Sequence, residues 1–250
     1  ALKEFAKTTL ADTTPDAADR PSVTLLDHDP DGEDKALAGL LYDLTGLSEQ
    51  QVREKVGALS DSEKQQLWAD LAGLRDNRRH RLGLGLELTE YEFDIVCDFG
   101  AYRDLQRHRV LSQQRQNLST LHGYDVPEQV KEAGHETAYR EAMDAAKQTF
   151  EQIAEDLPEQ AQYVVPFGYR MRFRMRMNLR EAYHLIELRS TPQGHPSYRF
   201  IAQEMFQRIK EVHPNAAAAM KFADLSTRDE MERRASEQKT SEKLAKLQEK

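Results

Sequence analysis

A strictly alternating run in the second half of the chain predicts a β-strand. From Tyr169 to Met177, every odd-numbered position carries a large apolar side chain and every even-numbered position carries an arginine. Successive side chains of a strand point to opposite faces, so this pattern predicts one buried face and one face of four arginines. Neighbouring arginines repel one another unless carboxylates or an anionic ligand neutralise them. The run is therefore interpreted as a paired surface face, an edge strand protected by charge, or part of an anion site.

Periodicity predicts further strands and several helices. Alternation from Tyr91 to Asp98 indicates a half-buried strand, and residues 21–26 can form a short one. The first of these carries Cys97, and a single cysteine excludes an internal disulfide and a cysteine-rich metal site. A long helix is predicted from Pro127 to Asp156. Capping residues predict the starts of other helices after Ser48, after Ser60 or Ser62, and after Asn178.

Length and composition bound the class of protein. The 250 residues suffice for one large or two small domains with a hydrophobic core. No apolar run approaches the ~18 residues that a membrane span needs. No signal-like leader opens the chain, so we expect a cytoplasmic protein without a membrane partner. The formal net charge of -8 argues against general nucleic-acid binding.

The chain divides into four predicted parts. Residues 1–20 have little apolar periodicity and are predicted to form a flexible lead-in, and residues 21–81 form a helical N-terminal part. Residues 82–225 form the core, and residues 226–250 form a charged tail. The first residue is Ala1, which indicates either removal of methionine or a segment of a longer chain.

Arginines also gather in the stretch 99–120. Apolar side chains at every third position from Phe99 to Leu105 indicate the buried face of a helix, and Arg103 and Arg107 project together from its end. Cations held there suit an anionic ligand. The eight histidines lack the spacing of a metal site and no glycine-rich phosphate loop is present, so no metal is predicted. The residues alone support a phosphorylated small ligand and no named reaction.

One motif in this stretch resembles a known family. The order Arg107-His108-Arg109-x-x-Ser112 resembles the first half of the signature of flavin-dependent thymidylate synthases, also called thymidylate synthase complementing proteins. Later positions follow the family pattern over about 30 residues: Arg172-Phe173, Asn178 with Arg180, Leu188-Arg189, and Arg199. The likeness covers roughly residues 86–215. The chain also looks like one half of a longer branch in which two such domains are fused in tandem.

The resemblance implies an α+β fold, helix-rich with a small central, largely antiparallel sheet. It implies reductive methylation of dUMP to dTMP, with FAD as cofactor and NADPH and methylenetetrahydrofolate as co-substrates. The residues implied to hold the flavin are Arg107, His108, Arg109 and Arg189. Those implied to bind the nucleotide are Arg107, Arg172 and Ser112. Arg199 is the implied catalytic residue, stabilising the ionised pyrimidine. A homotetramer or a second tandem domain is the implied partner.

The second half of the family signature is altered. Gln114-Arg115 replaces Asn-Glu, and Asn117 to Thr120 replaces Ser-x-Arg-Tyr, so the flavin half is retained better than the substrate half. Two hypotheses follow: an active family enzyme, or a degenerate domain that binds flavin or nucleotide, or has an assembly role, without catalysis. A third hypothesis is nucleic-acid binding through the arginines of residues 170–176.

Overall fold

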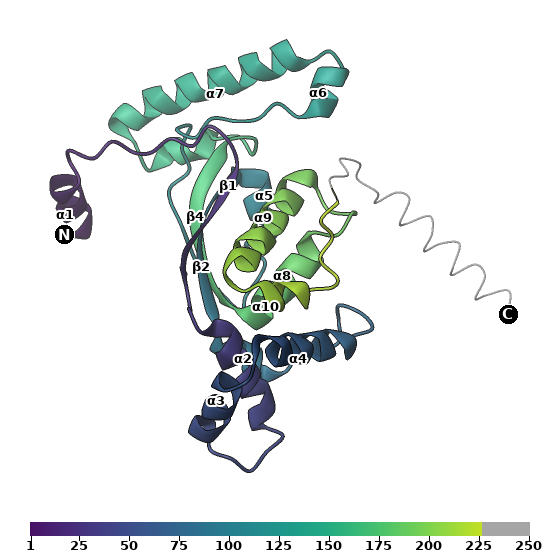
Figure 1. Ribbon diagram of the computed structural model, residues 1–250. Coiled ribbons are helices and arrows are strands. Elements are labelled where there is room, and N and C mark those ends of the chain that lie inside the picture. The colour runs from purple at the N-terminus through teal and green to yellow at the C-terminus, as the bar shows by residue number, and fades with distance from the viewer. Residues whose placement is uncertain (227–250) are drawn as a thin grey trace, which may run out of the picture.

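The computed structural model describes residues 1–226, which fold around a small four-stranded sheet (Figure 1). Its strands are β1 (Ser22–His28), β2 (Glu90–Asp98), β3 (Ser112–Arg115) and β4 (Arg170–Asn178). They lie in the order β1-β2-β4-β3, and each neighbouring pair is antiparallel. The predicted α+β class is therefore confirmed. The predicted tail 226–250 lies outside the described residues, except for Ser226.

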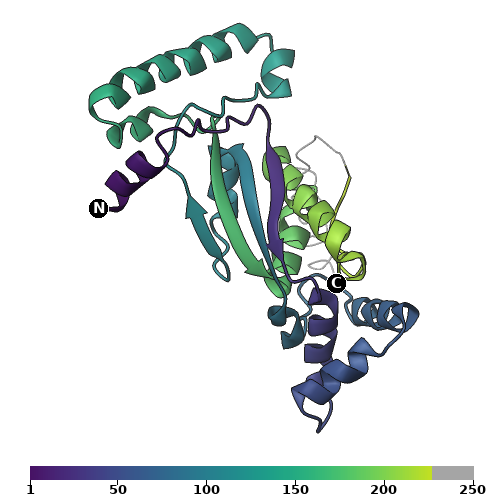
Figure 2. The same ribbon diagram turned by 60° about the vertical axis from the view of Figure 1, so that its left-hand side comes forward.

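Helices cover one face of the sheet and extend from both of its ends (Figures 1 and 2). The helices are α1 (Leu2–Thr9), α2 (Gly32–Tyr42), α3 (Glu49–Gly57), α4 (Asp61–Gly73), α5 (Phe99–Leu105), α6 (Glu128–Glu132), α7 (Glu136–Asp156), α8 (Leu179–Arg189), α9 (Pro196–Val212) and α10 (Pro214–Ala218), with 3₁₀ turns η1 (Leu84–Leu88) and η2 (Gln160–Val164). Helices α5, α8 and α9 pack on one face, α2 to α4 gather at one end, and α6 and α7 lie at the other. Among the described helices, none has the length and apolar character to cross a membrane.

The alternating run forms β4 as predicted, but it is not an edge strand. Its apolar side chains are all buried against the helices, and β4 lies between β2 and β3. On the other face, Arg172 Nε lies 3.2 Å from Asp94 Oδ2, and Arg174 Nη1 lies 3.1 Å from Glu92 Oε1. Arg176 pairs with Glu90. Acidic residues of β2 therefore neutralise these three arginines, and Arg170 pairs with Asp125. This confirms the paired-face interpretation, and the position of β4 shows that the edge-strand alternative is wrong.

Local capping signals are confirmed where they were predicted. Ser48 and Ser60 each form a reciprocal capping box at the start of α3 and α4, and Ser62 is not the cap. The Asn178 side chain accepts a hydrogen bond from the backbone N–H of Glu181 at the start of α8. These signals depend only on residues three positions apart, so they can be read without knowledge of the tertiary fold.

Two segments differ from the sequence expectations. The long helix is interrupted, because Gly134 has a φ of +74° and separates α6 from α7. The lead-in contains α1, and its later residues contact the sheet, since the Asp19 carbonyl accepts a hydrogen bond from Arg170 Nη2 at 2.9 Å. Strand β1, by contrast, forms where a short strand was predicted from residues 21–26, and it joins the central sheet from within the N-terminal part 21–81.

Gly85 allows η1 to touch the backbone of α2. A Cβ atom built on Gly85 would lie 2.2 Å from the Leu40 nitrogen and 2.7 Å from the Ala36 carbonyl oxygen. Backbone atoms cannot move aside as a flexible side chain does, so the contact requires glycine.

We expect Gly85→Ala to lower the free energy of unfolding by at least about 2 kcal/mol, because η1 must separate from α2. Gly57→Ala is the matched control, since a Cβ there meets nothing within 4 Å. Urea unfolding of both variants measures the effect. Equal stability of the two variants would contradict the proposed close approach.

His213 gives the fold a pH dependence. Its ring is buried at the start of α10, with Nδ1 2.7 Å from the Tyr91 hydroxyl, and burial lowers its pKa below the usual value. The unfolded chain therefore binds a proton on His213 more readily than the folded chain. Stability should fall as the pH is lowered from about 6.5, the ordinary histidine pKa, towards the lowered folded value.

We expect His213→Gln to reduce the difference in unfolding free energy between pH 7.5 and pH 5. The glutamine cannot take up the proton that the unfolded histidine binds. His122 and His184, whose pKa values burial also lowers, leave part of the slope in place. Urea unfolding at the two pH values measures this, and an unchanged difference would contradict the assignment.

Candidate functional site

His108 lies at the start of α8, where the segment that follows α5 places it. Asp98 caps α5, its carboxylate accepting the Ala101 N–H at 2.7 Å, and the helix then packs against β2 and α9. The chain then enters β3, where Ser112 pairs with Arg176 near the end of β4. His108 lies just before this pairing and is buried.

His108 connects two charged residues of α8. Its Nδ1 lies 2.6 Å from Glu181 Oε1, and its Nε2 accepts a hydrogen bond of 3.0 Å from Arg189 Nε. A guanidinium can only donate, so the bond from Arg189 requires Nε2 to be unprotonated and leaves the ring proton on Nδ1. We call these three side chains, Glu181, His108 and Arg189, the relay.

Two exposed arginines lie beside the relay. Together they form a pocket of about 200 Å³ whose lining residues are Arg107, His108, Arg109, Val110, Glu181, His184, Leu188 and Arg189. The Arg107 side chain is 67% exposed and lies 2.8 Å from Asp104 Oδ1. Arg109 makes no hydrogen bond or ion pair with another residue in the described part of the chain. The pocket therefore presents guanidinium donors for an anion: Arg109 is unpaired among the described residues, and Arg107 is exposed although it is paired with Asp104.

Arg189 is held from three sides. Besides its bond to His108, its Nη1 lies 3.7 Å from Asp104 Oδ1, and its guanidinium carbon lies 5.6 Å from the centre of the Tyr198 ring. Its side chain is largely buried. These contacts fix the direction of the guanidinium before any ligand binds, which lowers the entropic cost of binding.

His184 completes a group that sequence spacing does not reveal. His108, Glu181 and His184 have potential ligand atoms within 4.8 Å of one another, which is close enough to share a cation. Burial lowers the pKa of His184, Glu181 raises it, and the nearby cations Arg78 and Arg189 lower it further. Both ring nitrogens of His108 are already hydrogen-bonded, and Arg189 adjoins the group. The arrangement therefore favours an anion in the pocket over a metal ion.

The other residues implied by resemblance lie apart from this pocket. Arg172 is on the sheet face away from α5, α8 and α9, beside Asp94 and Asp16. Ser112 shares that face, because it pairs with Arg176. Arg199 is buried, with Nε donating to the Ser190 carbonyl at 3.0 Å. The structure thus gathers Arg107, His108, Arg109 and Arg189, and does not bring Arg172, Ser112 or Arg199 to them within one chain.

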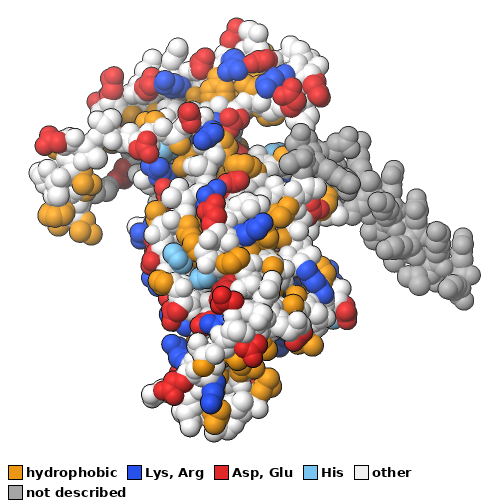
Figure 3. All heavy atoms as spheres, in the orientation of Figure 1, with side chains coloured by type: hydrophobic (Ala, Val, Ile, Leu, Met, Phe, Trp, Pro, Cys, Tyr) orange, Lys and Arg blue, Asp and Glu red, His pale blue; other side chains and the backbone are white. Residues whose placement is uncertain are grey.

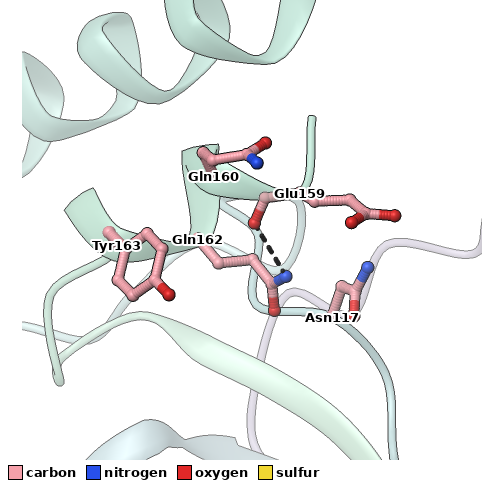
Figure 4. Close-up of a pocket in the computed structure, with 5 residues that line it drawn as sticks. All are labelled: Asn117, Glu159, Gln160, Gln162 and Tyr163. Carbon is pink, nitrogen blue, oxygen red and sulfur yellow. Dashed lines mark hydrogen bonds between the residues drawn. The ribbon is translucent and has the colours of Figure 1, made fainter. Parts of the chain in front are cut away.

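A larger hollow of about 440 Å³ has a different lining. It is formed by Asn117, Glu159, Gln160, Gln162 and Tyr163 (Figure 4). The Gln162 side chain is fixed, because its Oε1 accepts the Leu118 N–H at 2.9 Å and its Nε2 donates to the Glu159 carbonyl at 3.1 Å. Tyr163 is 90% exposed. The hollow has no arginine in its lining, so it offers no anion chemistry, although Asn117 belongs to the altered half of the motif.

Sequence reasoning missed Glu181. The one available signal is its place three residues after the Asn178 cap, where a glutamate usually reaches back to the cap. Here its carboxylate turns to His108 instead, and only the tertiary fold reveals this.

Comparison with known proteins identifies the family. The profile of the Thy1 family, described as thymidylate synthase complementing protein, matches residues 24–215. A UPF0159 protein of Chlamydia pneumoniae is 40% identical over 231 residues, covering 92% of this chain and 44% of that protein. A flavin-dependent thymidylate synthase of Geobacter sulfurreducens is 30% identical over 208 residues, covering 77% of this chain and 83% of that protein.

A UPF0159 protein of Thermoplasma acidophilum is 40% identical over 196 residues, covering 76% of this chain and 38% of that protein. The chain thus spans less than half the length of these UPF0159 relatives. The matched range contains both β2–β4 and the relay. The chain therefore belongs to the thymidylate synthase complementing protein family.

Proposed function

We propose that this chain is a flavin-dependent thymidylate synthase homologue that binds FAD at the pocket beside the relay. One observation carries the proposal: the fixed, largely buried Arg189 lines the same pocket as the exposed Arg107 and Arg109. Planar guanidinium donors match the oxygens of a phosphate group, and FAD carries two. Relatives named flavin-dependent thymidylate synthases support the choice of flavin over other anions.

The proposed reaction is reductive methylation of dUMP. Bound flavin, reduced by NADPH, would supply the reducing equivalents for transfer of the methylene of methylenetetrahydrofolate. The chain's own contribution is to bind and orient: Arg107, His108, Arg109 and Arg189 hold the cofactor, and Arg107 also lies where a nucleotide could reach it. Arg172 and Ser112 would bind the nucleotide, and Arg199 would stabilise the ionised pyrimidine.

This assignment requires more than one copy of the domain. Arg172 and Ser112 lie on the sheet face opposite the helices that form the pocket, so one chain cannot present all the proposed groups to one ligand. A second copy, or a second domain in tandem, would have to supply the nucleotide side. The tetramer and the cytoplasmic location implied at the outset stay predictions.

A specific observation favours the alternative, a degenerate domain that binds flavin without catalysis. Arg172 is already occupied by Asp94, with Asp16 at 3.6 Å, and so its charge is neutralised before any nucleotide phosphate arrives. The altered residues Arg115 and Asn117 stand where the family signature has its nucleotide-binding glutamate and serine. Flavin binding is common to both proposals, and only the nucleotide step separates them.

Nucleic-acid binding has less support. Three arginines of β4 pair with acidic residues of β2 and Arg170 pairs with Asp125, so the strand provides few free cations for a phosphate backbone. On the face drawn in Figure 3, Lys and Arg side chains alternate with Asp and Glu rather than gathering into one patch.

We expect the purified chain to take up FAD, and Arg109→Ala to raise the dissociation constant roughly 10-fold or more, since a charge-assisted hydrogen bond contributes ~1.5–3 kcal/mol. Fluorescence titration of FAD measures both. Arg174→Ala is the control, because it removes an exposed arginine outside the pocket that is paired with Glu92. Failure of the wild-type chain to bind FAD, or equal affinity of all three proteins, would overturn the proposal.

The nucleotide step decides between enzyme and binder. With flavin bound and reduced, an active enzyme should reoxidise it only when dUMP and methylenetetrahydrofolate are both added without oxygen. Arg172→Gln should then abolish the flavin reoxidation that depends on dUMP, without changing the affinity for FAD. Absorbance of the flavin measures the rate, and no dependence on dUMP would favour the degenerate domain.

A further inference from the structure

Glu181 is unexpected in a pocket lined by arginines. A carboxylate opposes the binding of an anion by its charge alone. Yet Glu181 lines the pocket, and its side chain is only 7% exposed. Its presence therefore calls for a role other than direct contact with an anionic ligand.

The hydrogen bonds of the relay run in one direction. Arg189 Nε donates to His108 Nε2, and His108 Nδ1 donates to the Glu181 carboxylate. If the proton were on Nε2 instead, that N–H would face the Arg189 N–H, and the 3.0 Å contact would become repulsive. The carboxylate, which can only accept, excludes this arrangement because it requires a proton on Nδ1.

Glu181 is held in a fixed position as the hydrogen-bond acceptor of His108. Its backbone N–H is bound by the Asn178 side chain at 2.9 Å, at the point where β4 passes into α8. Its place in the first turn of α8 favours a negative charge through the helix dipole. The acceptor for His108 is therefore anchored by both the sheet and the helix.

We propose that Glu181 is a positioning residue of the pocket, acting through the tautomer of His108 to direct Arg189 at an anionic ligand. This rests on the proposed FAD site, and it adds a residue that the family resemblance does not supply. Glu181 itself touches no ligand. It acts over the length of α8, since Arg189 is eight residues further along the helix and His108 is hydrogen-bonded to both.

Glu181→Gln tests the proposal with little change in shape. A glutamine can accept from Nδ1 through its oxygen or donate to it through its nitrogen, so it no longer selects one tautomer. We expect a single Nδ1-protonated His108 in the wild-type chain, and a mixture in the variant. Nitrogen-15 NMR of labelled histidine distinguishes the two, and the Arg189 Nε–H signal should shift with the change. These measurements need no ligand.

Ligand binding should follow the tautomer. We expect Glu181→Gln to raise the dissociation constants of both FAD and inorganic pyrophosphate by roughly 10-fold. Glu187→Gln is the control, because Glu187 is a buried carboxylate of the same helix that accepts from Arg75 at 2.8 Å and does not touch His108. It should leave the His108 signals and both affinities unchanged, and urea unfolding shows whether each variant folds.

The outcomes separate this inference from the proposed function. A wild-type His108 protonated on Nε2 would overturn the inference, whatever the variants do. So would a wild-type chain that binds pyrophosphate no more tightly than Glu181→Gln. If the tautomer and pyrophosphate results are as expected but FAD does not bind, the positioning role stands and the flavin proposal fails.

Discussion

The antiparallel pairing of β2 with β4 is the constraint on which the rest of the structure depends. Nine residues of each strand are in register, so the apolar side chains of both meet the helices and the charged side chains of both meet one another. Because the strands run in opposite directions, the helices that follow them start at opposite ends of the sheet. Helix α5 and the chain after it therefore run towards the start of α8, and this brings His108 to Glu181.

Much of the fold could be predicted because its signals are local. Alternation gave β2 and β4, and capping residues gave the starts of α3, α4 and α8. What could not be predicted depends on distant partners or on a backbone conformation that the residue pattern does not show. The central position of β4 requires knowledge of its neighbours, and the break at Gly134 requires its backbone conformation. The hydrogen bond between the lead-in and β4, from Arg170 to the Asp19 carbonyl, joins residues 151 positions apart.

The candidate site divides in the same way. The family resemblance implied that Arg107, His108, Arg109 and Arg189 hold one cofactor, and these four side chains line one pocket. The sequence pattern could not predict that Glu181 would leave its usual capping role, because that depends on a histidine 73 residues away. It also could not separate Arg172 from this group, since the face of the sheet that it occupies follows from the register with β2.

The central claim is that the relay orients Arg189 towards an anionic cofactor in the pocket beside α8. The most direct measurement is the change in side-chain NMR signals when FAD is added to the intact chain. The account predicts that the Arg189 Nε–H and His108 ring signals shift in proportion to bound FAD, while the amide signals of Asn117 and Gln162, in the larger hollow, stay in place. Shifts confined to Asn117 and Gln162, with Arg189 and His108 unchanged, would contradict it.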